Sequence, residues 1–167
     1  MDDAESASTQ DVSQQFEQNI RGTITAFRKR RERTVAAAEQ SAQMRERAVS
    51  RFNQIVESDV IPVFNRTAEL LKENCEVQIH RREHTEERPF VLSVEMVIAP
   101  KSDVRIRCLR QPHPKLEICL ERETFRVAIF TEHLRAAKLQ LEEIELPELK
   151  AEKLEQCIDN FLAGIFR

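Results

Sequence analysis

Glycine is almost missing from this 167-residue sequence, which contains only Gly22 and Gly164. Neither lies in a run of alternating apolar residues, so glycine-rich phosphate loops and strained nucleophile turns are nearly excluded. Tryptophan and tyrosine are absent, which removes two residues that stack on nucleic-acid bases and anchor interfaces. No motif locates a catalytic nucleophile or a general base. We therefore predict a protein that is not an enzyme.

Long apolar runs and paired cysteines are missing as well. None of the four cysteines has the C-x-x-C spacing of zinc and redox sites. The N-terminal residues lack the basic and apolar segments of a signal peptide. No apolar run approaches the ~18 residues that a membrane helix needs. We expect reduced thiols, a cytoplasmic location and no membrane partner.

The histidines do not form a recognisable metal site. His80 and His84 are four residues apart, but we expect them at the end of a strand and in a loop. There this spacing does not bring two imidazoles onto one metal ion, as it would on a helix. We predict exposed, titrating histidines and no metal or other cofactor.

Alternation of apolar and polar residues dominates the middle of the chain. Phe90, Leu92, Val94, Met96 and Ile98 recur at period two, which places them on one face of a strand. Short links separate such runs, and this favours an antiparallel meander. The predicted strands cover residues 75–79, 90–98, 104–108, 116–120 and 125–129, and 138–142 could form a sixth.

Helical patterns flank this region, so the predicted fold class is α+β. Residues 1–11 look like a disordered acidic tail, and Asp11 caps a long helical arm over 12–51. The rest, 52–167, is predicted as one α+β head domain. Its first helix carries Pro62 and either kinks there or restarts with Ser58 or Asp59 as the cap. A C-terminal helix after Pro147 should pack on one face of the sheet.

The predicted arm carries a thin apolar stripe. Its strongest members are Phe16, Ile20, Ile24 and Phe27, and Arg31 occupies the next position of the same face. Isolated helices gain little stability without a packed face. We expect the stripe either to contact a second chain or to pack on the chain's own head domain.

Charge is distributed unevenly along the arm. Residues 1–20 contain five acidic and no basic residues, whereas residues 21–51 contain nine basic and three acidic residues. A basic run could bind phosphates, although neighbouring residues of a helix point in different directions. The candidate anion-binding residues are Arg28, Lys29, Arg30, Arg31 and Arg33.

A second candidate surface lies on the sheet face opposite the predicted core. We expect Glu95, Arg107 and Glu117 to form one row of ion pairs across three strands. This face is either solvated or covered by a partner, because apolar and charged residues are mixed on it. With Glu117 exposed, Glu117→Ala should cost under ~1 kcal/mol. The candidate interaction residues are Val91, Val97, Arg105, Arg107, Leu109, Arg126 and Phe130.

Two main functional hypotheses follow, and an enzyme with a site on the open sheet face is a third. The first is a non-enzymatic interaction or assembly protein, whose arm captures a protein partner or a second copy of the chain. The alternative is a protein that binds anions or nucleic acid through the basic run, assisted by arginines of the sheet face. The sequence leaves the partner and the biological process open.

Overall fold

The computed structural model describes residues 3–85, 88–101, 113–132 and 138–166, with side chains from Gln15 onward. The chain divides into two compact units. We call residues 1–44 the arm unit and residues 45–167 the head unit. The predicted boundary at 51–52 falls inside the head unit.

Helix α1, Asp3–Ile55, contains 53 residues and passes from the arm unit into the head unit. It begins at Asp3 rather than at the predicted Val12. Alanine, glutamine, glutamate and arginine, all strong helix formers, supply much of its sequence. The hydroxyl groups of Thr23, Thr25 and Thr34 donate hydrogen bonds to carbonyl oxygens four residues earlier, which satisfies these polar side chains within the helix.

A π-helical turn, η1, Val56–Val60, connects α1 to α2, Ile61–Leu71. Pro62 has no N–H group to donate to the preceding turn, and such a loss is commonly absorbed by a local change of helix type. The backbone stays in the right-handed helical region at Ile55, Val60 and Ile61, and no side chain caps η1 or α2. The chain therefore neither stops nor restarts behind Ser58 or Asp59.

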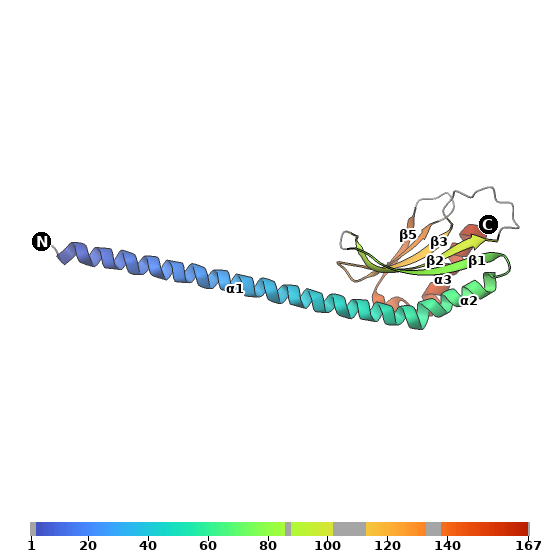
Figure 1. Cartoon of the computed structure of the whole chain (residues 1–167), viewed down its shortest axis with the longest axis horizontal. Coiled ribbons are helices and arrows are strands. Elements are labelled where there is room, and N and C mark those ends of the chain that lie inside the picture. Colours follow the sequence, from blue (N-terminus) through green and yellow to red (C-terminus); the bar gives the residue numbers. More distant parts are fainter. Residues whose placement is uncertain (1–2, 86–87, 102–112, 133–137, 167) are drawn as a thin grey trace. The chain divides into compact units, whose positions relative to one another are not determined.

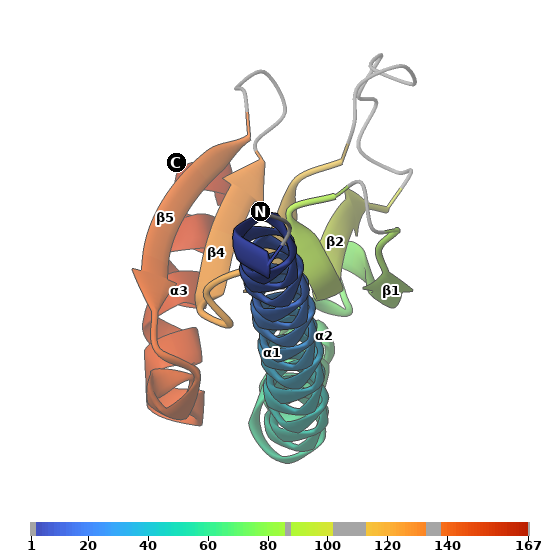
Figure 2. The same cartoon turned by 90° about the vertical axis from the view of Figure 1, so that its left-hand side faces the viewer.

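Five antiparallel strands follow in the order β1-β2-β3-β4-β5, with β1 and β5 at the edges (Figure 2). The predicted strand over 104–108 lies outside the described residues. Because β2 pairs directly with β3, no strand stands between them in the sheet. The strands are β1, Cys75–Glu83; β2, Phe90–Pro100; β3, Lys115–Glu121; β4, Val127–Glu132; and β5, Leu139–Ile144.

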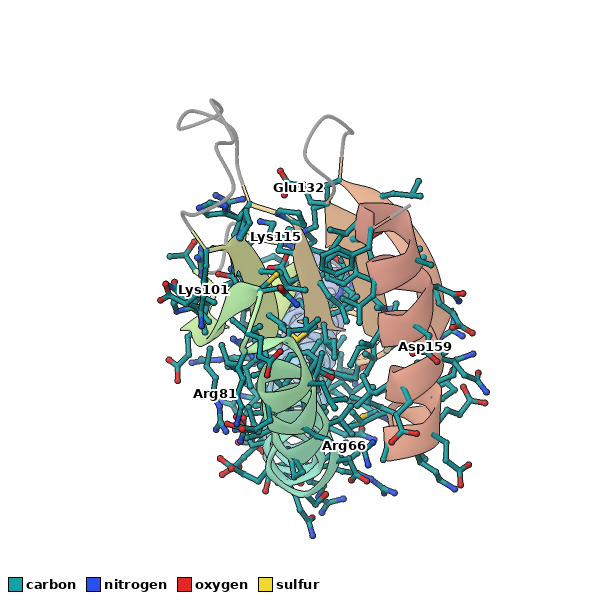
Figure 3. All side chains as sticks on the ribbon, turned by 90° about the vertical axis from the view of Figure 1, so that its right-hand side faces the viewer. Arg66, Arg81, Lys101, Lys115, Glu132 and Asp159 are labelled. Atoms are coloured by element: carbon teal, nitrogen blue, oxygen red, sulfur yellow. The ribbon has the colours of Figure 1, made fainter. Side chains whose placement is uncertain are left out.

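The chain ends with a 3₁₀ turn, η2, Leu146–Glu148, and helix α3, Ala151–Phe166. Pro147 lies in η2, ahead of the helix that we expected it to start. Figure 1 gives the order of the elements, and Figure 3 shows α2 and α3 on the same side of the sheet. The predicted packing of the C-terminal helix on one sheet face is confirmed.

One apolar cluster forms the core of the head unit. The sheet contributes the period-two residues Val94, Met96 and Ile98 together with the matching residues of β3 and β4. The helical side contributes Phe52, Val56, Val60, Val63 and Phe64 and, from α3, Leu154, Cys157, Ile158 and Phe161. Ile118 lies at the centre of β3 and is fully buried, so the predicted phase of this strand is correct.

Replacing Ile118 by aspartate should unfold the head unit, because the new carboxylate would be buried among apolar side chains without a partner. The matched variant Ile118→Val should cost only about 0.5–1.5 kcal/mol. Urea unfolding monitored by circular dichroism compares the two. Equal midpoints for both variants would contradict the inward orientation of Ile118.

Candidate functional site

The arm unit presents the predicted apolar stripe to solvent. The exposed fractions are 64% for Phe16, 43% for Ile20, 46% for Ile24 and 66% for Phe27. At 3.6 residues per turn these four side chains lie within about 80° of one another around the helix. Two phenylalanines and two isoleucines on one helix face form a larger apolar surface than scattered surface residues do. We call these four residues the arm stripe.

The predicted basic run follows the arm stripe directly. Arg28, Lys29, Arg30, Arg31 and Arg33 are all exposed. Among the described residues, none of the five forms an ion pair. The arm's one ion pair within the described part of the chain joins Arg21 to Glu17 at 3.7 Å. The positive charges of the run therefore have no partner in the described part of the arm unit.

The second sheet face is not a solvated surface, contrary to one of our predictions. Glu95 and Glu117 are exposed by only 2% and 6%, and Cys119 and Ala128 are fully buried. Glu95 lies directly opposite Glu117 in the β2–β3 register. The predicted row, with one residue between these carboxylates, is wrong because β2 and β3 are neighbours; Arg107 itself lies outside the described residues. We call the residues Ser93, Glu95, Glu117 and Cys119 the acidic sheet face.

Each buried carboxylate of the acidic sheet face has a basic partner from elsewhere in the chain. Arg82 of β1 donates a hydrogen bond to Glu95, and Lys138 donates one to Glu117 at 2.5 Å. Two like charges directly opposite in a sheet repel each other, so these partners are required. Neither partner was predicted, because Lys138 is 21 residues away from Glu117 in sequence and no local pattern connects them.

Aromatic side chains lie beside these ion pairs. The rings of Phe90 and Phe130 meet edge to face with centroids 5.5 Å apart. The Lys138 ammonium group lies 4.2 Å from the centroid of Phe130, within cation–π distance. Phe90 was predicted on the core face, but the register shifts between Phe90 and Leu92. Such a β-bulge changes the alternation of side chains, and this accounts for the contact with Phe130.

The four described interaction residues of the sheet are not exposed together as one open surface. Val91 is buried, and Val97, Arg126 and Phe130 are half-buried. Arg126 forms ion pairs with Glu143 and Glu145. Arg105, Arg107 and Leu109 lie outside the described residues.

His84 contacts the acidic sheet face and is half-buried, although it was predicted to be exposed. Its Nε2 atom lies 2.8 Å from the hydroxyl of Ser93. Burial lowers the pKa of His84, and the positive charges of Arg88, Lys138 and Arg82 lower it further, against an opposing effect of Glu117. Within the described residues, no three histidine, cysteine or acidic side chains come together as they would to hold a metal ion.

Burial disfavours the reactive form of the three described thiols. Burial is the main cause that raises the pKa of Cys119, and the negative charge of Glu117 adds to it. Burial also raises the pKa values of Cys75 and Cys157. Because the thiolate is the reactive form of cysteine, these three residues are structural.

The protonation state of Glu117 in the acidic sheet face depends on pH. Burial alone would raise the pKa of its carboxyl group, but the hydrogen bond and charge of Lys138, together with Lys115, outweigh burial and lower the pKa. Lys115 lies beside Glu132 at the ends of β3 and β4, with 3.2 Å between charged atoms (Figure 3). The folded head unit therefore favours ionised Glu117.

Replacing Glu117 by glutamine should lower stability at pH 7 by about 1–2 kcal/mol, because a charge-assisted hydrogen bond is lost. This revises the small cost expected for an exposed Glu117. A lowered folded-state pKa stabilises the fold above the unfolded pKa of ~4.3, and the benefit is lost as pH falls through the folded pKa. The difference between wild type and Glu117→Gln should therefore shrink below pH ~4.3.

Urea unfolding at a series of pH values measures this difference. The control is Glu123→Gln, because Glu123 is an exposed residue of the turn between β3 and β4. The control should match wild type within about 0.5 kcal/mol at every pH. A constant difference for Glu117→Gln from pH 7 to pH 3 would contradict the ionised state of Glu117.

Comparison with known proteins adds no functional information. No protein-family model, no curated protein and no solved structure matches the chain. No helix in the described parts of the chain is both long and apolar enough to cross a membrane.

Proposed function

We propose that this chain is a non-enzymatic interaction or assembly protein that associates through the arm stripe. The observation that carries the proposal is the exposure of Phe16, Ile20, Ile24 and Phe27 on one face of α1. Fully burying one such side chain contributes about 1.5–3 kcal/mol. Association is the simplest way for a helix to gain this stabilisation.

The end of α1 shows how such a face behaves when it has a partner. In the head unit the same helix buries Phe52, and Val49 packs against the core. Phe16 and Phe27 are eleven residues apart, and Val49 lies two further steps of eleven residues along the helix. The difference between the two parts of α1 is the availability of an apolar surface to pack on. A second copy of the chain supplies one to the arm stripe.

The acidic sheet face contributes little to this proposal. Its carboxylates are buried and paired with Arg82 and Lys138, so a partner would have to replace existing ion pairs. An assembly role for the head unit requires a different surface. We assign the association to the arm unit.

Replacing Ile20 and Ile24 by glutamine should abolish association or weaken it at least about tenfold. Glutamine preserves helix propensity, so the helix itself should remain. The control variant carries Thr25→Gln and Ala36→Gln, two exposed positions on the opposite side of α1. Light scattering and sedimentation of the full chain measure the mass and the dissociation constant.

An oligomeric wild type, an oligomeric control and a monomeric stripe variant are the expected results. A monomeric wild type at concentrations above about 100 μM would reject self-association and leave a stripe that packs within the chain or binds another protein. Equal dissociation constants for both variants would place the association surface elsewhere.

The second candidate function is the binding of nucleic acid or another polyanion. Five exposed basic residues without an ion pair among the described residues favour it. It predicts binding of a labelled 20-nucleotide duplex whose affinity falls steeply between 50 and 200 mM salt, because counterions are released. The variant Arg30→Gln with Arg33→Gln should weaken this binding and reduce its salt dependence. Absent or salt-independent binding would reject this function.

A further inference from the structure

We infer that the arm pairs with a second copy of this chain in antiparallel orientation, centred near residue 22. The inference rests on the proposed self-association through the arm stripe and specifies its geometry. Three features of the arm lead to it, namely the symmetry of the stripe, an arginine on the stripe, and the charges beside it.

The arm stripe is almost symmetric about its middle. Phe16 and Phe27, and likewise Ile20 and Ile24, are placed symmetrically about residue 22 to within half a residue. Their exposure follows the same symmetry, with the two phenylalanines near 65% and the two isoleucines near 45%. A two-fold axis at residue 22 would therefore set each phenylalanine against a phenylalanine and each isoleucine against an isoleucine. The stripe is complementary to itself when one copy is reversed.

Arg31 disfavours the parallel alternative. It lies on the same face of α1 as the stripe, one turn beyond Phe27. In a parallel, in-register pair the two Arg31 side chains would face each other at the interface, and like charges that meet there repel. In the antiparallel pair Arg31 faces residue 13 of the second copy, which is a serine. Reversal therefore removes this repulsion.

The charges beside the stripe agree with the reversed orientation. Glu17 and Arg28 lie on the same flank of the stripe, within about 30° of each other around the helix. A two-fold axis at residue 22 places Glu17 of one copy opposite residue 27 of the other. Glu17 therefore lies about one residue from Arg28 of the second copy. In the parallel pair, by contrast, the run 28–33 would face its own copy.

The orientation has a consequence for the assembly. Each head unit begins at Arg45 on α1. With a rise of 1.5 Å per residue, the two Arg45 residues would lie about 70 Å apart along the paired helices. In a parallel pair the two Arg45 residues would lie side by side.

Distances between two spin labels distinguish these arrangements. Labels attached at Thr25→Cys or at Ala36→Cys would be exposed and lie away from the stripe. Cys75, Cys119 and Cys157 are buried, and Cys108→Ala removes the remaining thiol. In the antiparallel dimer the two labels move apart along the helix axis by about 3 Å for each residue between the label and the centre. The axial component of the label-to-label distance should therefore be about 33 Å longer at position 36 than at position 25. The measured distance should be clearly longer at position 36.

Each result decides a separate question. Nearly equal distances at the two positions would overturn the antiparallel inference but leave the association through the stripe intact. An absent dipolar signal at both positions, together with a monomeric mass, would overturn the association and the inference with it. As a control, Ile20→Gln with Ile24→Gln should abolish the signal of the label at position 36.

Discussion

The phase of the β-meander is the constraint on which the rest of the head unit depends. A single alternation sends Met96 and Ile118 into the core under α2 and α3. The same alternation places Glu95 and Glu117 on the reverse face, directly opposite each other and nearly buried. Two adjacent buried carboxylates are stable only with positive partners. The core therefore determines where Arg82 and Lys138 have to be.

This requirement also affects where the molecule can bind a partner. A sheet face whose charges are paired within the chain offers few groups to a ligand, and its aromatic residues Phe90 and Phe130 contact each other and Lys138. The arm unit has the opposite character. Its phenylalanines and isoleucines are exposed, and its basic run has no ion pair with the described residues. The head unit exposes Leu70, Leu139, Leu141 and Phe166 as well, but only the arm groups its exposed apolar residues on one helix face beside a basic run. This supports the assignment of association to α1.

The elements that depend on local periodicity could be predicted from the sequence. Period two located four of the five described strands and the orientation of Ile118, and the segment left open at 138–142 corresponds to β5. The partners of the acidic residues could not be predicted, because strand order and long-range contacts decide them. A strand inserted at 104–108 placed Arg107 beside Glu117, whereas the β2–β3 pairing leaves that role to Lys138. The bulge that redirects Phe90 has no signal in the apolar pattern.

The arm shows the reverse relation between sequence and structure. Its helix is regular, so the positions of Phe16, Ile20, Ile24 and Phe27 follow from the sequence once the helix is given. What the helix adds is the grouping of residues around its axis. That grouping places Arg31 on the stripe and sets Glu17 and Arg28 on one flank. The arm stripe is symmetric in shape, and opposite charges lie beside its two ends. It is therefore complementary to a reversed copy of itself. The charge gradient along the arm acquires a role in the proposed dimer.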